Sequence, residues 1–342
     1  MTIVNDLLDQ VELDEERQRR FYLGISGIGN SNNRLVWMRY RWLMPDDWEP
    51  RVLRLLDLGN VVEEDLIKKL RKIPGAKIYD VDKNGKQFKT KAFGGHVRGH
   101  IDGVAKDLPG LESDKPHLLE FKTAKEYDAQ IHLYMGLFKL SHCIVIVYNK
   151  NNSALYTEVI DFDLQKFNMF MEKAKSILLA NTPPENNIPV TDYRIRSYMT
   201  PRQQSAYLGK SLPDKLHCRS CRFSNPDIES GNWVCSKDNR IISEKRQLTG
   251  CINHNYIPEL IPATLIEKDE DMVLYEKDGF RFLNVPADKH SDENSFYSSE
   301  ELIQVVNSGF PMDVLEKADW IKKSLQGTIV KIKPWVETGV PF

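Results

Sequence analysis

The sequence predicts an α/β protein in which a mixed central β-sheet is flanked by helices. Three observations support this class: apolar residues at helical spacing across residues 34–72, short strand-like runs between 77 and 123, and a helix–strand–strand–helix pattern between 124 and 180. Helices and half-buried strands that alternate in this way cover their apolar faces against one another. We therefore expect one mixed α/β core within residues 1–185.

The first part of this core is predicted to change from helix to sheet. Pro45 and Pro50 divide the helical region, because proline lacks an amide proton and clashes with the preceding turn. Strands are expected at 77–81, 87–91, 96–105 and 117–123. The first two flank Asn84-Gly85, a pair favoured in tight turns between strands, so they are predicted to form a β-hairpin.

The second part of the core is predicted to contain a helix at 124–140, strands at 142–149 and 154–161, and a helix at 163–180. Apolar residues share one face of each helix, as in helices that cover a sheet. The following segment, NTPPENNIP, has the composition of a linker. We therefore expect the core to end near residue 185.

The composition excludes several classes of protein. The chain has 342 residues, of which 41% are hydrophobic and 28% charged, as is typical of globular proteins with two or three domains. It has no apolar run of membrane-spanning length and no secretory signal pattern at its start, so we expect a cytoplasmic protein without a membrane partner. The formal net charge is −2, so attraction to a polyanion would require local basic patches.

Four short motifs carry the candidate chemistry. In chain order they are Gly59-x-x-x-Glu63, Gly99-x-x-Asp102, Glu120-Phe121-Lys122 and Gln130-x-x-x-Tyr134. Strand geometry places Glu120 and Lys122 on the same face, and pairing of neighbouring strands can bring Asp102 beside Glu120. Phosphodiester cleavage needs a hard cation with oxygen ligands and a group that orients or deprotonates water. Asp102, Glu120 and the main-chain carbonyl of Phe121 could supply the oxygens, and Lys122 the amine.

In this order the motifs resemble the RecB-type and lambda-exonuclease-type branch of the PD-(D/E)xK nuclease superfamily, over roughly residues 20–180. The resemblance implies a restriction-endonuclease-like core and a Mg²⁺- or Mn²⁺-dependent deoxyribonuclease. It further implies an exonuclease that acts in recombination, repair or replication, and a phage is one candidate source. DNA is the implied substrate, and a recombination or replication protein is a further candidate partner.

The resemblance also implies roles for individual residues. Glu63, Asp102 and Glu120 would hold the catalytic metal, Lys122 would act on the nucleophile, and Gln130 and Tyr134 would shape the active site. Glu64 is an alternative to Glu63, although the spacing from Gly59 favours Glu63. Ser31, Asn32 and Asn33 stand where relatives with an iron–sulfur cluster carry an early cysteine, so that cluster is not expected. His96 and His100 alternate with Arg98 before Asp102, and they either line the cleft or are simply exposed.

Four of the five cysteines form a late cluster, at Cys218, Cys221, Cys235 and Cys251. Four thiolates in a short, loop-rich segment predict a structural Zn²⁺ site. His254 could replace Cys251 as the fourth ligand, and unpaired thiols or an iron–sulfur cluster are the alternatives. Cys143 lies in an apolar run and is predicted to be a buried strand thiol.

The cysteine cluster overlaps a basic stretch at 191–222, with seven Lys or Arg residues and two acidic residues. We expect a zinc-binding module at 186–258, which either holds this +5 segment as a DNA-binding surface or only stabilises a small subdomain. Residues 259–342 are expected to form a C-terminal region, for which no motif indicates a role.

Two other classes of function compete with the nuclease. A catalytically inactive nucleic-acid-binding or assembly protein could keep the same fold, but it would not need Asp102, Glu120 and Lys122 together. A zinc-dependent hydrolase is disfavoured, because four thiolates leave no open coordination position. The sequence therefore favours the metal-dependent nuclease.

Overall fold

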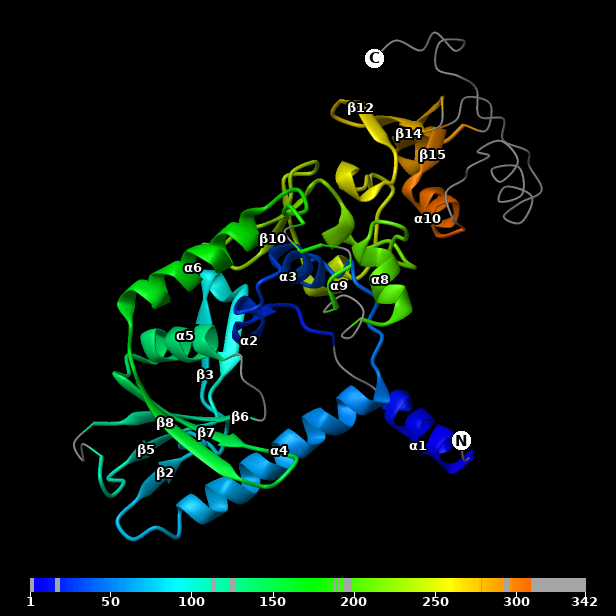
Figure 1. The fold of residues 1–342 in the computed structure, drawn as a ribbon. Helices are drawn as coiled ribbons and strands as arrows, with labels where there is room; N and C mark the ends of the chain where they lie inside the picture. The colour runs from blue at the N-terminus through cyan, green and yellow to red at the C-terminus, as the bar shows by residue number, and fades with distance from the viewer. Residues whose placement is uncertain are drawn as a thin grey trace. The chain divides into compact units, whose positions relative to one another are not determined.

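The computed structural model describes residues 3–15, 19–111, 115–122, 127–186, 188–189, 191–193, 199–277, 279–291 and 296–308. Its contacts divide the chain into two compact units. Unit 1 comprises Met1–Ser31, Trp48–Leu178 and Ile228–Gly231, and unit 2 comprises Asn32–Asp47, Leu179–Asp227 and Asn232–Phe342. The boundaries between these two units differ from the domain boundaries expected at residues 185 and 258. Helices and several β-sheets give the mixed α/β class that the sequence predicts (Figure 1).

Unit 1 is built on a five-stranded sheet with the strand order β2-β5-β6-β7-β8. The strands are β2 (Lys77–Tyr79), β5 (Gly103–Lys106), β6 (His117–Lys122), β7 (His142–Tyr148) and β8 (Leu155–Asp161). Only the central pair of β6 and β7 is parallel, and the other three pairs are antiparallel. The central strand β6 is almost completely buried, so residues at its end lie in a low-dielectric environment.

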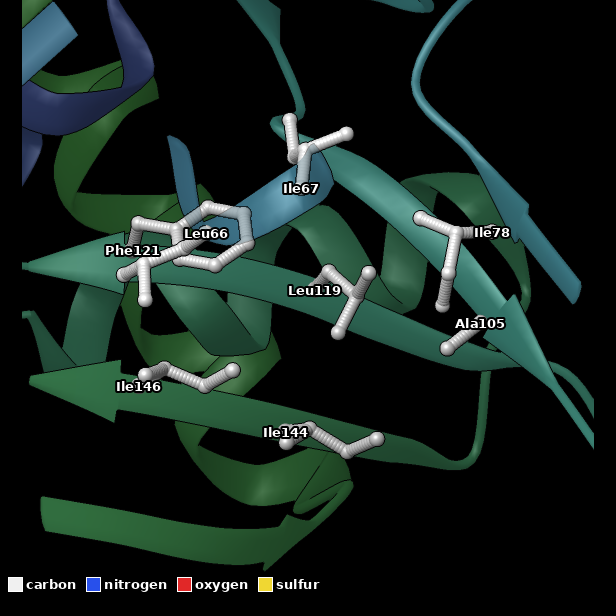
Figure 2. Packing of buried hydrophobic residues seen from close by; sticks show 8 residues of the cluster. All are labelled: Leu66, Ile67, Ile78, Ala105, Leu119, Phe121, Ile144 and Ile146. Carbon is white, nitrogen blue, oxygen red and sulfur yellow. The ribbon is translucent and has the colours of Figure 1, made fainter. Parts of the chain in front are cut away.

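The long helix α4 (Pro50–Leu70) covers one face of this sheet. Figure 2 shows the packing, in which Leu66 and Ile67 of α4 meet apolar side chains from four strands: Ile78, Ala105, Leu119, Phe121, Ile144 and Ile146. Burial of each large aliphatic or aromatic side chain contributes roughly 1.5–3 kcal/mol. This cluster therefore fixes the position of α4 relative to the end of β6.

Two further helices complete this part of unit 1. Helix α5 (Asp128–Phe138) contacts β6 and β7, and α6 (Leu164–Leu179) lies beyond α5 (Figure 1). The Phe167 ring of α6 occupies the space beside Gly136, where a Cβ would come within 2.3 Å of the ring. The expected start of α5 at residue 124 lies outside the described residues, because 123–126 are not described.

One prediction about the strands is wrong, and another is confirmed only in part. The expected strand 96–105 is broken at Ile101-Asp102 into β4 (Val97–His100) and β5, which belong to different sheets, because β4 pairs with β1 (Leu23–Gly24) and β3 (Lys89–Ala92). The expected hairpin across Asn84-Gly85 is short: the Asp82 amide donates to the Lys86 carbonyl, and an antiparallel bridge joins Val81 to Gln87. Beyond this bridge β2 and β3 enter separate sheets.

Short helices connect the elements of unit 1 and begin unit 2. In unit 1 these are α1 (Ile3–Asp14), α2 (Ile25–Ile28) and the 3-10 turn η1 (Phe93–Gly95). Helix α3 (Asn33–Tyr40) belongs to unit 2, and the Asn32 side chain caps it by accepting a hydrogen bond from the Leu35 amide. The proline-based division of the helical region into α3 and α4 is thus confirmed.

Unit 2 contains two sheets of its own. The three-stranded sheet is formed by β9 (Ser224–Pro226), β10 (Trp233–Cys235) and β11 (Arg240–Ile242), and the four-stranded sheet by β12 (Thr264–Lys268), β13 (Val273–Lys277), β14 (Phe280–Val285) and β15 (Phe296–Ser298). Its helices and 3-10 turns are α8 (Pro201–Tyr207), α9 (Glu244–Gln247), α10 (Ser299–Asn307), η2 (Cys218–Ser220), η3 (Pro258–Leu260) and η4 (Ala287–Lys289). Leu274, Leu283 and Val285 form the core of the four-stranded sheet.

Hydrogen bonds join the Asn255-Tyr256 segment to the four-stranded sheet within unit 2. The side chain of Asn255 donates to the carbonyls of Asp271 and Asn284, at 3.1 Å each, and Asn284 accepts from the Tyr256 amide. These bonds satisfy the Asn255 side-chain nitrogen and hold its segment against the sheet. No helix in the described part of the chain combines the length and apolar composition that a membrane span requires.

Candidate active site

The structure brings three acidic side chains and one lysine together at the end of β6. Asp102, at the break between β4 and β5, accepts a hydrogen bond from the Phe121 amide at 2.8 Å. This bond holds the carboxylate beside β6, because the antiparallel pairing of β5 and β6 places Gly103 opposite Leu119. The Phe121 ring lies on the other face, in the apolar cluster under α4.

Glu120 is the centre of this group. Its side chain is 0% exposed, and its Oε2 accepts hydrogen bonds from Lys122 Nζ at 2.7 Å and from Gln130 Nε2 at 3.0 Å. The other oxygen, Oε1, is buried and has no hydrogen-bond partner in the described part of the chain. A buried carboxylate oxygen without a partner is costly, and a bound cation would satisfy it.

Glu63 reaches the same group from α4. It is half-buried, and its carboxylate interacts electrostatically with Asp102 and Lys122. Glu64 instead has a side chain that is 73% exposed and pairs with Lys68 one turn later, at 3.5 Å. Of the two alternatives, the structure therefore places Glu63 rather than Glu64 beside the candidate site.

The electrostatics of the group favour a cation. Burial, followed by the charge of Asp102, raises the pKa of Glu63 to about 7 and that of Glu120 to about 8. Burial also raises the pKa of Asp102, although Lys122 opposes this shift. Burial alone would lower the pKa of Lys122, but Glu120 and Asp102 outweigh it and raise this pKa. The single charge of Lys122 does not offset three neighbouring carboxylates, whose pKa values stay raised. A divalent ion would supply the further positive charge.

Gln130 and Tyr134 connect α5 to this group. Tyr134 interacts electrostatically with Glu120 and Asp102, and its hydroxyl lies near the His100 backbone and the Gln130 side chain. Its ring lies directly against Gly99, where a Cβ would come within 2.6 Å of the ring and the hydroxyl. Gly99 is therefore required by the packing of Tyr134, a relation that the sequence did not indicate.

Two other side chains near the site gave no signal in the sequence motifs. Asp80, just after β2, contributes to the negative potential at Glu63 and also pairs with Arg71 at 2.5 Å. Cys143 of β7 is buried, as the sequence predicted, and interacts electrostatically with Glu120. Burial raises the pKa of its thiol, so Cys143 is held in its neutral form.

The four late cysteines are neighbours in unit 2. Cys218 interacts electrostatically with Cys251 and Cys235, and Cys221 does so with Cys251 and Cys218. Burial raises the pKa of Cys218 to about 11 and that of Cys221 to about 12, and backbone amides of Asn255 and Phe223 hydrogen-bond to Cys221. Among the described residues, no group of three or more His, Cys, Asp or Glu side chains has the geometry to hold a metal ion as it stands. The metal ligands therefore remain predictions.

His254, the alternative fourth ligand, follows Cys251 by three residues in the sequence, and its side chain is buried. Its Nε2 lies 3.1 Å from Ser220 Oγ and 3.3 Å from the His217 carbonyl oxygen. Burial lowers the pKa of His254 to about 4, so this ring is neutral near physiological pH. A neutral imidazole is the form that binds metals, and the alternative stays open.

The basic stretch 191–222 is not a continuous basic surface, and this expectation needs correction. Arg219 is 1% exposed, because its guanidinium lies over the rings of Trp42 and Trp233 and donates to Gln247. Arg202 pairs with Asp47 and Asp214. Arg194 and Arg196 lie outside the described residues. Arg219 therefore stacks on aromatic rings and Arg202 forms ion pairs within the protein, although both were expected from the sequence to be charges available to DNA.

Comparisons with known proteins give weak structural likenesses only. No family model matches the chain, and no curated protein matches it. Solved structures that resemble it include that of SSO0001, with a TM-score of 0.35 and 14% identity over 59% of this chain and 98% of the other. Two structures of the alkaline exonuclease LHK-Exo from Laribacter hongkongensis, one in complex with dAMP, have TM-scores of 0.33 and 0.32 and identities of 12% and 13%, over 51% of this chain and 90% of the exonuclease.

Proposed function

We propose that this protein is a metal-dependent nuclease that hydrolyses DNA phosphodiester bonds. Its active site would consist of Glu63, Asp102, Glu120 and Lys122. The observation that carries the proposal is the buried Oε1 of Glu120, which has no hydrogen-bond partner among the described residues. Glu120 also interacts electrostatically with two further carboxylates, Asp102 and Glu63, whose pKa values are raised. A fold gains nothing from such a cluster without a cation. Oxygen donors of this kind suit Mg²⁺ or Mn²⁺.

The chain's own residues divide the work of such a reaction. Glu63, Asp102 and Glu120 would hold the cation, which would polarise the scissile phosphate when bound. The Phe121 amide fixes Asp102, and Gln130 fixes Glu120, so both carboxylates are oriented before substrate arrives. The ammonium of Lys122, held at 2.7 Å from Glu120, would orient the attacking water or stabilise negative charge on the phosphate.

The first test is a cleavage assay with purified protein. End-labelled linear and circular DNA, single- and double-stranded, would be incubated with Mg²⁺, Mn²⁺ or EDTA. We expect hydrolysis with either metal and none in EDTA, and loss of linear but not circular DNA if the protein is an exonuclease. Binding of DNA without cleavage under every metal condition would support the inactive nucleic-acid-binding alternative instead.

Isosteric variants then test the residues. Asp102→Asn and Glu120→Gln keep the shape of each side chain but remove its charge, so we expect a loss of cleavage of about a hundredfold or more with DNA binding retained. Glu64→Gln is the matched control, because it removes one carboxylate next to Glu63 from an exposed position. Wild-type cleavage by either site variant would overturn the assignment.

We further propose that Cys218, Cys221, Cys235 and Cys251 hold a structural Zn²⁺. The support is the electrostatic contact between these thiols and the two backbone amides that hydrogen-bond to Cys221. Zinc would bind them as thiolates, because its charge stabilises the negative sulfur atoms that burial otherwise disfavours. The role in this proposal is to stabilise unit 2, since Arg219, between the first two cysteines, is buried rather than presented to DNA.

A further inference from the structure

Four basic side chains cover the exposed face of β3 and β4. Lys89 and Lys91 on β3 and Arg98 and His100 on β4 are all exposed. The antiparallel register places Lys89 opposite His100 and Lys91 opposite Arg98. Residues that are directly opposite share a face, so these four form one patch, called here the basic face. Neither strand contains an acidic residue.

The basic face is unfavourable for the fold by itself. Like charges directly opposite each other in a sheet are destabilising, and Lys91 and Arg98 form such a pair. None of the four side chains forms an ion pair with any described residue. Asp82 interacts electrostatically with Lys89, but its pKa is lowered first by the Lys86 and Asn84 amides of its own turn. The positive charge is therefore available for an anionic ligand.

The opposite face of the same sheet is fixed to the candidate active site. There Gly99 packs against Tyr134, and the same helix α5 carries Gln130, which donates to Glu120. Strand β4 also continues directly from His100 through the buried Ile101 to Asp102. The basic face consequently has a fixed position relative to the carboxylates, and both belong to unit 1.

Arg98 shows how a cation on this face is held. Its Nε donates to the Gly95 carbonyl at 2.8 Å, and its guanidinium lies 5.3 Å from the centre of the Tyr22 ring. These contacts orient the guanidinium while the side chain as a whole stays exposed. An oriented, exposed arginine can form paired hydrogen bonds with a phosphate group.

We propose that the basic face binds the phosphate backbone of the DNA strand that leads into the candidate active site. This inference rests on the proposed nuclease function and names the surface that holds its substrate. Alternate residues of a strand are about 7 Å apart, so Lys89 and Lys91 can reach different phosphates of one strand. Lysine acts on phosphate as a point charge, so the contact holds DNA without reading its sequence.

The test compares two charge-matched double variants. Lys89→Gln with Lys91→Gln removes two charges from the basic face, and Lys72→Gln with Lys150→Gln removes two from exposed positions elsewhere in unit 1. Binding of labelled single- and double-stranded DNA would be followed by fluorescence anisotropy over a range of salt concentrations, with Ca²⁺ in place of Mg²⁺. Circular dichroism of both variants would verify that they fold.

Loss of two phosphate contacts should lower the slope of log K against log salt by about 1.4 for single strands or 1.8 for duplex DNA. This corresponds to an affinity about 25- to 60-fold weaker near 0.1 M salt. The control variant should bind and cleave as the wild type does. The DNA form whose slope changes more is the one that this surface holds.

Failure of this inference is distinguishable from failure of the proposed function. If the wild type binds and cleaves DNA but both double variants keep its affinity and salt slope, the basic face is not the binding surface and the nuclease assignment stands. If the basic-face variant loses affinity while the wild type never cleaves, the surface binds DNA but the nuclease assignment falls. An equal loss in both double variants would overturn the inference, because it would reflect net charge alone.

Discussion

Removal of the Glu120 charge should change how the stability of the metal-free protein depends on pH. In the folded protein the pKa of Glu120 is raised from 4.5 to about 8, and its side chain is 0% exposed. The folded state therefore binds a proton that the unfolded state has released between these pH values. This contribution to stability is fully present below pH 4.5 and is lost as the pH rises through 8.

The magnitude follows from the size of the shift. A change of about 3.5 pKa units at about 1.36 kcal/mol each gives at most about 5 kcal/mol of unfolding free energy lost between pH 5 and pH 9 in EDTA. Glu120→Gln has no such proton, so its stability should fall less over the same range, and the dependence that remains comes from Glu63 and Asp102. Mn²⁺ should restore the stability of the wild type at high pH, because a cation that binds only the folded state stabilises it.

Urea unfolding measured by far-UV circular dichroism would follow this loss. Tryptophan fluorescence gives an internal control, because Trp37, Trp42 and Trp233 belong to unit 2 and Trp48 is the only described tryptophan of unit 1. The dichroism transition should show the pH effect of Glu120 more strongly than the fluorescence transition. An equal pH dependence in wild type and Glu120→Gln, or no effect of Mn²⁺ on the wild type at pH 9, would refute the reasoning.

Further predictions concern single positions. Gly99→Ala should destabilise the protein and reduce cleavage, because the added Cβ would lie 2.6 Å from Tyr134; melting temperature and kcat measure both effects. Gly59→Ala should instead stabilise α4 by about 1 kcal/mol, since the added Cβ meets nothing within 4 Å, and a lower melting temperature would contradict this. Lys122→Ala should lose cleavage with little loss of metal affinity by calorimetry, and full activity of Lys122→Arg would exclude a proton-transfer role. Elemental analysis should find about one zinc per chain, and iron with visible absorbance would overturn the zinc assignment. Cys218→Ser should lower the melting temperature of unit 2, as measured by tryptophan fluorescence.

Local sequence patterns were sufficient for some features, because the structures that they predict depend on neighbouring residues. Pro45 and Pro50 divided the helical region, since a proline ring is incompatible with a helix interior wherever it occurs. The two-residue period of a strand placed Glu120 and Lys122 on one face, and in the structure they are hydrogen-bonded. The apolar run around Cys143 likewise predicted a buried strand.

Other features depended on which segments pair over long distances, and the tertiary structure alone decided them. The break at Ile101-Asp102 arises because β4 and β5 pair in different sheets, while each local pattern is compatible with one continuous strand. The spacing from Gly59 already favoured Glu63 over Glu64, but only the packing of α4 shows which of the two carboxylates lies near Asp102 and Lys122. Arg219 counts as a surface charge in any sum over the sequence, yet aromatic rings from distant segments bury it. The sequence by itself thus determined local geometry and the chemical groups present, while long-range packing determined which of those groups meet and which remain exposed.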